Sequence, residues 1–336
     1  MKKIILLLLL LCSPAYATNL VNINGNAIGS IVNFGGNAVS GINNVDGNGV
    51  STCATCTLGG SCMVNQETCD FNTRVLADSG TVVNAASVDA AYTLAKDGTN
   101  GFTIKQWCSA DFAWKASTSS YAGTVYCLGS SADLTGHGST TYRPVWTANV
   151  IHTSYPSFAF TSSHVEYFSF GNIGMADANS GFVVSAGNSS NAGNNTMFFW
   201  GVYSTGATNQ ISLSCSGVSP YYVRLFTANT TESTLNLVTS NIAATSTTHY
   251  LWNWKVAATT WHIVDFSKNV TTFNGSASYS LTPAGASGMI GATNLAGSGS
   301  LTWNGYITEW LILASEYTAG QYTAITNYFN NKYALY

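Results

Sequence analysis

The last fifty residues of the chain change from a strand pattern to a helix pattern. Between residues 302 and 312, polar positions alternate with bulky apolar ones, which predicts a half-buried strand. Beyond it, apolar residues recur at helical spacing, at Tyr322, Ile325 and Phe329. Thr318 and Gln321 form a capping box at the start of this helix. The chain is therefore expected to end in a strand, a turn and an amphipathic helix.

From Tyr142 onward, short apolar runs recur roughly every 10 to 15 residues, and Gly, Asn and Ser separate them. Short strands at this spacing indicate an all-β sandwich or jelly roll. Further upstream, residues 85–95 are the one internal helix candidate, with apolar residues on one face. The predicted strands cover residues 158–160, 165–170, 182–184, 197–200, 211–215, 221–226 and 250–256.

The first seventeen residues have the pattern of a secretory signal peptide. Lys2 and Lys3 precede an apolar run, and Ala15-Tyr16-Ala17 offers a cleavage site, so residues 1–17 are predicted to be a signal peptide. The protein is then secreted, extracellular or at the cell surface. No other apolar run reaches the about 18 residues of a membrane span.

An eleven-residue repeat follows, in which Gly-Asn steps and aliphatic residues keep the same phase between residues 24 and 56. A Gly/Asn-rich arm of stacked β-arcs over residues 18–52 is the specific interpretation, and a flexible leader is the alternative. Charged residues make up only 7% of the chain and the net charge is −3. We therefore do not expect the protein to bind nucleic acid. The low charge also leaves little electrostatic repulsion against self-association through the arm.

Seven cysteines remain after the signal peptide, and in an exported chain they indicate disulfides. Residues 53–130 are expected to form a small cysteine-bearing module, in which Cys108 pairs with Cys127 and the others pair among themselves. Zinc is the alternative for the first four cysteines, although paired C-x2-C knuckles are missing. The seventh, Cys215, is interpreted as a buried thiol. The expected disulfide cysteines are Cys53, Cys56, Cys62, Cys69, Cys108 and Cys127.

Several motifs of the C-terminal half occur in a familiar order. They are Asp133 to Gly138 with Arg143-Pro144, the segment 249–270, Ile290-Gly291-Ala292, and the series Trp303, Gly305, Ile307 and Glu309. Over residues 124–335 the chain resembles the concanavalin A-like lectin/glucanase superfamily, in particular its laminin-G-like domains. The resemblance implies an all-β, concanavalin A-like jelly-roll β-sandwich with a short C-terminal helix, over residues 131–336. The disulfide-bearing module and the β-arc arm would precede it.

The sequence offers little for catalysis. Glycoside hydrolysis needs two facing carboxylates, and the Glu-x-Asp-x-x-Glu strand of the superfamily's glucanases is absent. Glu309 stands where the resembled family keeps a structural glutamate. No Gly-x-Ser-x-Gly elbow and no zinc-binding histidine spacing occur. We therefore expect no enzyme activity and assign no catalytic residue.

Loop aromatics are the expected ligand-binding residues. Tyr250, Trp252 and Trp254 alternate along one strand and so share a face, which could stack on a sugar. The resemblance implies that this face points inward, and the three residues are therefore assigned to the core. The resemblance leaves calcium open as a cofactor, held by Asp133, Asp177 and Asn179. The predicted ligand-binding residues are Tyr142, Trp146, Tyr155, Tyr221 and Tyr222.

Three functions follow from these observations. The first is a secreted, non-enzymatic carbohydrate-binding or adhesion protein, whose partner is a glycan or a cell-surface polysaccharide. The second is a structural subunit of an extracellular filament or surface layer, joined through residues 18–52. The third is a glycoside hydrolase.

Overall fold

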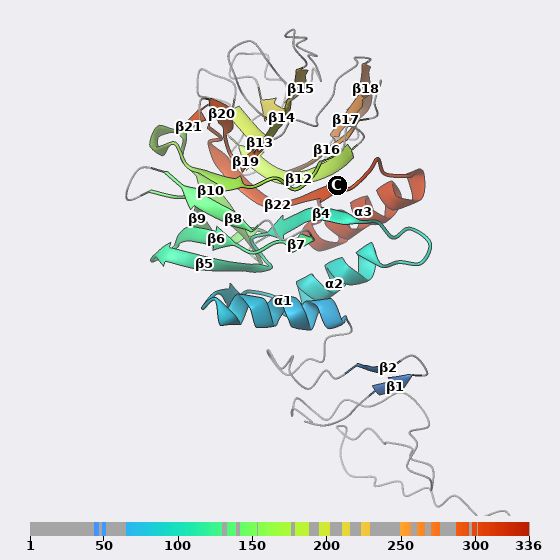
Figure 1. The fold of residues 1–336 in the computed structure, drawn as a ribbon. Coiled ribbons are helices and arrows are strands. Elements are labelled where there is room, and N and C mark those ends of the chain that lie inside the picture. The colour runs from blue at the N-terminus through green and yellow to red at the C-terminus, as the bar shows by residue number, and fades with distance from the viewer. Residues whose placement is uncertain are drawn as a thin grey trace, which may run out of the picture. The chain divides into compact units, whose positions relative to one another are not determined.

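The computed structural model of the chain divides into two units, one of Met1–Arg74 with Ala85–Thr93 and one of Val75–Asn84 with Leu94–Tyr336. Figure 1 shows its elements. The residues described are 44–46, 49–51, 65–129, 133–138, 142–152, 154–175, 179–187, 195–201, 210–215, 223–228, 249–256, 261–265, 270–275, 287–295, 298–300 and 302–335.

The helix α2 (Ala85–Ala95), most of which belongs to the first unit, confirms the internal helix predicted from the sequence. The helix α1 (Gln66–Ala77) was not predicted, because most of its residues are polar. Asp89 joins the two helices: its Oδ1 accepts hydrogen bonds from the Asn65 backbone N–H and the Thr68 hydroxyl, both at 2.9 Å. The strands β1 (Asn44–Asp46) and β2 (Gly49–Ser51) pair antiparallel within the predicted arm. The rest of the arm lies outside the described residues.

The second unit is built on antiparallel strands, and β22 (Gly305–Leu313) is central to the first group of them. One edge of β22 pairs with β12, and its other edge pairs with β10 and then with β4. The other members of the group are β4 (Ile104–Ser109), β7 (Leu128–Gly129), β9 (Val145–Ile151), β10 (Tyr155–Phe160), β12 (Asn179–Gly187), β16 (Tyr250–Val256), β17 (Trp261–Asp265) and β18 (Val270–Gly275).

A second group of strands runs from β3 through β11 to β15, and it joins the first where Tyr121 on β6 lies opposite Val145 on β9. In spatial order its members are β3 (Thr81–Val82), β5 (Ala113–Thr118), β6 (Tyr121–Val125), β8 (Leu134–His137), β11 (Tyr167–Phe170), β19 (Ser287–Ile290), β13 (Asn195–Gly201), β14 (Gln210–Cys215) and β15 (Val223–Ala228). A separate hairpin joins β20 (Thr293–Leu295) to β21 (Ser298–Ser300). The fold is mainly β, as the sequence predicts.

The main core combines side chains of both strand groups. Trp252, Trp254 and Trp310 come from the first group, and Phe168 and Ile290 come from the second. The assignment of the alternating residues of β16 to the core is therefore confirmed. Because these positions are buried, the aromatic residues of β16 are not a sugar-binding face.

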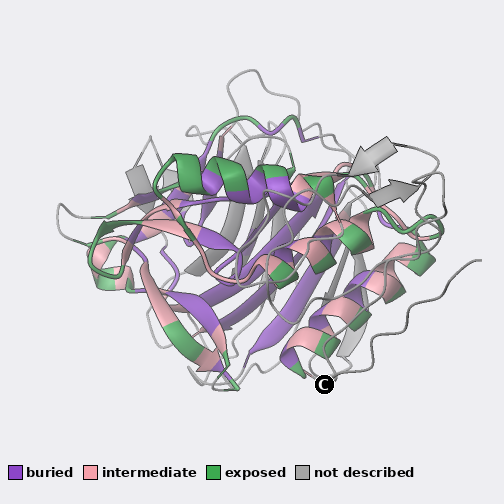
Figure 2. Cartoon of the chain, turned by 90° about the horizontal axis from the view of Figure 1, so that it is seen from below, coloured by how far each residue is buried: buried purple, intermediate pink, exposed green. Residues whose placement is uncertain are grey.

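The C-terminal helix α3 (Ala319–Tyr333) begins as the capping box predicts. The Thr318 hydroxyl accepts from the Gln321 N–H at 3.2 Å, and the Gln321 Oε1 accepts from the Thr318 N–H at 2.8 Å. The buried side of α3 includes Phe329, whose ring stacks with Phe182 of β12 at 6.1 Å. Figure 2 shows this helix, near the mark C, with buried and exposed stripes. One side of α3 therefore covers the outer face of the first strand group.

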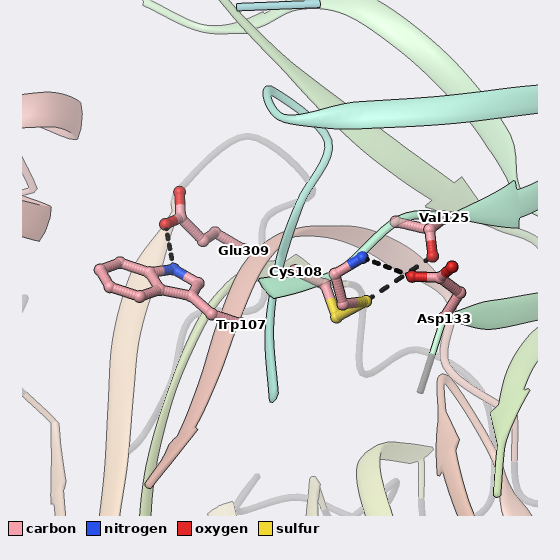
Figure 3. The surroundings of a disulfide bond; sticks show 6 residues. Trp107, Cys108, Val125, Asp133 and Glu309 are labelled. Carbon is pink, nitrogen blue, oxygen red and sulfur yellow. Dashed lines mark hydrogen bonds between the residues drawn. A yellow bond between two sulfur atoms is a disulfide. The ribbon is translucent and has the colours of Figure 1, made fainter. Parts of the chain in front are cut away.

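The disulfide between Cys108 and Cys127 is present, as predicted. Figure 3 shows Cys108 and Trp107 pointing to opposite sides of β4, as neighbours on a strand do. Cys69 is also disulfide-bonded, and the pairing of the other cysteines stays a prediction. The expected module boundary at residue 130 differs from the structure, because Cys108 lies opposite Trp310 in the sheet. The strand that carries Cys108 therefore pairs with β22 of the C-terminal half.

A tight contact between β12 and β16 gives a first testable prediction. A Cβ on Gly181 would lie 2.2 Å from the indole of Trp254, which is fully buried and donates to Asn179 Oδ1 at 3.0 Å. We expect Gly181→Ala to lower the free energy of unfolding by about 1–3 kcal/mol, measured by urea denaturation. The matched control is Gly171→Ala, where a Cβ meets nothing within 4 Å. Equal stabilities of the two variants would contradict this packing.

Candidate ligand-binding surface

The outer face of the first strand group holds a buried polar network under α3. Glu309 is fully buried, and its carboxylate accepts hydrogen bonds from both the sheet and the helix. The donors are Trp107 Nε1 at 2.6 Å, Ser109 Oγ at 3.1 Å, Tyr328 OH at 3.2 Å, Lys332 Nζ at 2.8 Å and Tyr333 OH. This carboxylate holds the helix on the sheet, which agrees with the structural role expected for it.

Lys332 is the cation of this network. Its Nζ lies 2.8 Å from Glu309 Oε2 and 3.3 Å from Asp111 Oδ2. Burial alone would lower the pKa of Lys332, but the Glu309 carboxylate and its neighbours raise that pKa well above the usual value. The amine is therefore charged at neutral pH, and the network contains a true ion pair.

The outward side of the second strand group carries a histidine stacked on a tyrosine. His137 on β8 lies opposite Tyr167 on β11, and their rings stack with centroids 4.9 Å apart. His137 Nε2 lies 2.6 Å from the hydroxyl of Ser169, two residues along β11. Burial lowers the pKa of His137, and the positive charge of Arg143 lowers it further. His137 is therefore neutral at pH 7, and both rings are half-buried.

A second such pair lies on the connections beside these strands. The ring of Tyr142 stacks on His164 with centroids 3.8 Å apart and an angle of 15°, and Tyr121 approaches Tyr142 edge-on at 6.3 Å. Tyr142 remains 37% exposed. His164 ends a short 3-10 helix, η2 (Ser162–His164). An exposed ring supported from behind is suited to contact a flat apolar ligand surface.

Glu166 holds this support in place. Only 2% of it is exposed, and its Oε2 accepts from the Thr161 N–H at 2.7 Å. Its Oε1 lies 3.3 Å from His164 Nδ1. The carboxylate therefore clamps both ends of η2 and fixes the ring under Tyr142.

The clamp gives a second prediction, on pH dependence. Burial raises the pKa of Glu166, although hydrogen bonds from Thr161 and His164 oppose this rise. The folded protein then keeps a proton on Glu166 at pH values where the unfolded chain, with a pKa of about 4.3, has lost it. Stability should therefore fall as pH rises from about 4 through the folded pKa. We expect Glu166→Gln to remove this part of the slope.

The measurement is the free energy of unfolding of both proteins by urea titration, at several pH values from about 3.5 to 7. All other titrating groups are shared by the two proteins, so their difference reports Glu166 together with its contact to His164. A difference that does not change with pH would contradict the raised pKa.

The predicted ligand-binding residues do not form one group. Tyr142 belongs to the exposed pair just described, while Trp146 is half-buried and stacks on Trp114 at 5.3 Å. Tyr155 instead packs edge-on against Tyr333 at the end of α3, with centroids 5.1 Å apart. Tyr221 and Tyr222 lie outside the described residues. Sequence reasoning missed His137 and His164 because no fixed spacing links histidines from different strands and turns.

The residues predicted to hold calcium have other contacts where they are described. Asn179 is buried and accepts from the Trp254 indole at 3.0 Å, and Asp133 Oδ1 accepts from the Cys127 N–H at 3.0 Å. Asp177 lies outside the described residues. Among the described residues, no three His, Cys, Asp or Glu side chains gather in a way that could hold a metal ion.

Comparison with known proteins gives no family. No family model matches the chain, and no curated protein matches it. Solved structures do show similarity, including domain 4 of a GH43 extracellular arabinanase from Geobacillus stearothermophilus in complex with arabinotriose. That match has a TM-score of 0.41 and 13% identity, and covers 66% of this chain and 97% of that one.

Two further matches have the same character. The CBM40 of a Ruminococcus gnavus IT-sialidase bound to alpha2,3 sialyllactose has a TM-score of 0.37 and 14% identity, covering 45% of this chain and 83% of that one. The enzymatically active domain of tailspike protein 2 of bacteriophage CBA120 has a TM-score of 0.46 and 12% identity, covering 59% and 30% respectively. At this level the matches carry no argument about function, which must come from the side chains of this chain.

The helices among the described residues include none that is both long and apolar enough to span a membrane.

Proposed function

We propose that this protein is a non-enzymatic, glycan-binding protein that acts outside the cell. The observation that carries the proposal is the exposed ring of Tyr142, which stacks on His164. The buried Glu166 in turn holds His164 in place. We call its neighbourhood the Tyr142 surface, and define it as Tyr121, His137, Tyr142, Arg143, His164 and Tyr167.

The chemistry of this surface suits a sugar. The C–H face of a pyranose ring is apolar and packs on an aromatic ring, while its hydroxyls need polar partners nearby. Here the supported ring of Tyr142 supplies the flat contact, and the side chains of His137 and Arg143 supply polar groups. Because η2 is clamped at both ends, little side-chain entropy should be lost when a ligand binds.

The proposal that the protein is not an enzyme rests on its two most deeply buried glutamates among the described residues, Glu309 and Glu166. Glu309 is beneath α3, and five donors already contact its carboxylate. The carboxylate of Glu166 contacts Thr161 and His164 and is almost fully buried. Neither carboxylate is placed to face a second one across a sugar, as glycoside hydrolysis requires.

The proposal also includes a fold family and a cellular location. We assign the sandwich to the concanavalin A-like, laminin-G-like jelly rolls, on the motifs of residues 124–335. We also propose export, because the disulfide between Cys108 and Cys127 is of a kind that persists in oxidising compartments. The apolar N-terminal run fits the same route.

The decisive test is a glycan array, followed by titration calorimetry with a glycan that binds. Tyr142→Ala should weaken binding by about 2 kcal/mol, or roughly 30-fold, because it removes the stacking ring. The control is Tyr155→Ala, which removes an aromatic ring beside α3 and should leave affinity unchanged. If the two variants lose affinity equally, or if no glycan binds, the proposal is wrong.

A further inference from the structure

We propose that the Tyr142 surface selects glycans bearing a negatively charged group, a carboxylate or a sulfate, and that Arg143 is the residue that binds this group. The inference rests on the proposed function, because it names the class of glycan that the same surface would take.

Arg143 is a half-buried arginine, and the described residues provide no counter-charge for it. It is only partly exposed, and within the described part of the chain the structure gives it no hydrogen bond and no ion pair. Removing a guanidinium even partly from water is costly unless hydrogen bonds replace those that water made. In a chain with only 7% charged residues, such a placement calls for an explanation.

The position of Arg143 joins the two stacked pairs. It follows Tyr142 directly, and its charge reaches His137, whose pKa it lowers. The backbone closes tightly at this point, because a Cβ on Gly138 would lie 1.9 Å from the Tyr142 carbonyl oxygen and 3.4 Å from the backbone nitrogen of Arg143. The charge of Arg143 therefore acts on the first stacked pair, and its backbone continues directly from Tyr142 of the second pair.

The carboxylates near this stretch have other partners. Glu166 accepts from the Thr161 N–H and contacts His164, and Asp133 accepts from the Cys127 N–H. His137 is neutral at pH 7, so it does not compete for an anion. Arg143 is then the cation of the surface that is available to a ligand.

An acidic sugar satisfies both features together. The planar fork of arginine donates two parallel hydrogen bonds to a carboxylate or a sulfate, which fixes the orientation of the group. A sugar ring held in this way beside the guanidinium could lie against the face of Tyr142. A neutral sugar would use the aromatic contact and leave the guanidinium unsatisfied.

The experiment compares two matched pairs of polymers by titration calorimetry with the full mature chain. Polygalacturonate is compared with its methyl ester, and dextran sulfate with dextran. We expect at least one charged polymer to bind about tenfold more tightly than its neutral partner, the effect of a charge-assisted hydrogen bond. The pair that shows the difference identifies the anionic group.

Variants make the assignment specific to Arg143. Arg143→Gln should reduce the affinity for the charged polymer to that for the neutral one, and Arg143→Lys should restore only part of it, because lysine lacks the fork. The control is Arg74→Gln, which removes one exposed positive charge from α1 and should change affinity less than about twofold. Thermal melts should show that both Arg143 variants are folded.

The outcomes separate this inference from the function beneath it. Equal binding of charged and neutral polymers, with loss in Tyr142→Ala, would overturn the role of Arg143 and keep glycan binding. Equal losses in Arg143→Gln and Arg74→Gln would also overturn it, since the attraction would then be general. Absence of binding to all four polymers and to the array would overturn both.

Discussion

Glu309→Gln is expected to lower the free energy of unfolding by about 3–5 kcal/mol, as is typical when one partner of a buried ion pair is removed. The variant leaves the ammonium of Lys332 under α3 without the carboxylate at 2.8 Å, and puts an amide NH2 where an oxygen accepted hydrogen bonds. Asp111, at 3.3 Å from the same amine, compensates for only part of the lost charge. Urea denaturation at pH 7 measures the effect.

The control is a pair of the same chemical kind at the surface. Lys255 Nζ lies 3.4 Å from Glu316 Oε2, and both side chains are about 30% exposed. Glu316→Gln should therefore cost less than about 1 kcal/mol. If Glu309→Gln were equally mild, the network would not hold the helix as described.

The same network sets an alkaline limit to stability. Burial raises the pKa of Tyr328 and of Tyr333, and the charge of Glu309 raises the pKa of Lys332. A raised folded pKa contributes stability that is complete below the unfolded value, about 10 for these groups, and is lost as pH rises through the folded pKa. The contribution of these groups should therefore be constant through neutral pH and fall above about pH 10.

Removing the disulfide in Cys108→Ala/Cys127→Ala should cost about 3 kcal/mol. The bond closes a loop with a sequence separation of 19, and a loop near this length is worth about that much through the entropy of the unfolded chain. Both sulfurs are also in the core, at 0% and 4% exposure, so their loss removes packing as well. Denaturation of wild type and double variant, each with and without reductant, measures it.

Reduction should bring the wild type close to the double variant in stability. Reduction should lower the stability of the double variant much less than that of the wild type. The smaller loss in the double variant comes from reduction of the disulfide of Cys69. A wild type that keeps its full stability after both core thiols are shown to be free would contradict the prediction.

Local sequence patterns predicted the elements whose cause is local. The capping box of Thr318 and Gln321 and the helix at residues 85–95 follow from spacing alone, and the structure has them. Spacing also put the aromatic residues of β16 on one face, and the family resemblance indicated that this face is the buried one. The helix α1 was missed because more than half of its residues are polar, and its buried apolar residues are Cys69, Phe71 and Val75.

Contacts between distant segments could not be predicted in this way. Cys108 was assigned to a separate module because cysteines are dense in that half of the chain, yet its strand pairs with β22, about 200 residues away. The stacking of Tyr142 on His164 likewise depends on how the backbone at Tyr142 and the short helix η2 meet. Tyr142 was selected from the sequence as an aromatic residue near the entrance motif, and its partner had no signal.

Glycan binding at Tyr142 is tested most directly by a crystal structure of the mature protein with the oligosaccharide that binds most tightly on the array. We expect a sugar ring about 4 Å from the ring of Tyr142 and parallel to it, with the clamp of Glu166 and His164 unchanged. A sugar bound elsewhere, without contact to Tyr142, would contradict it.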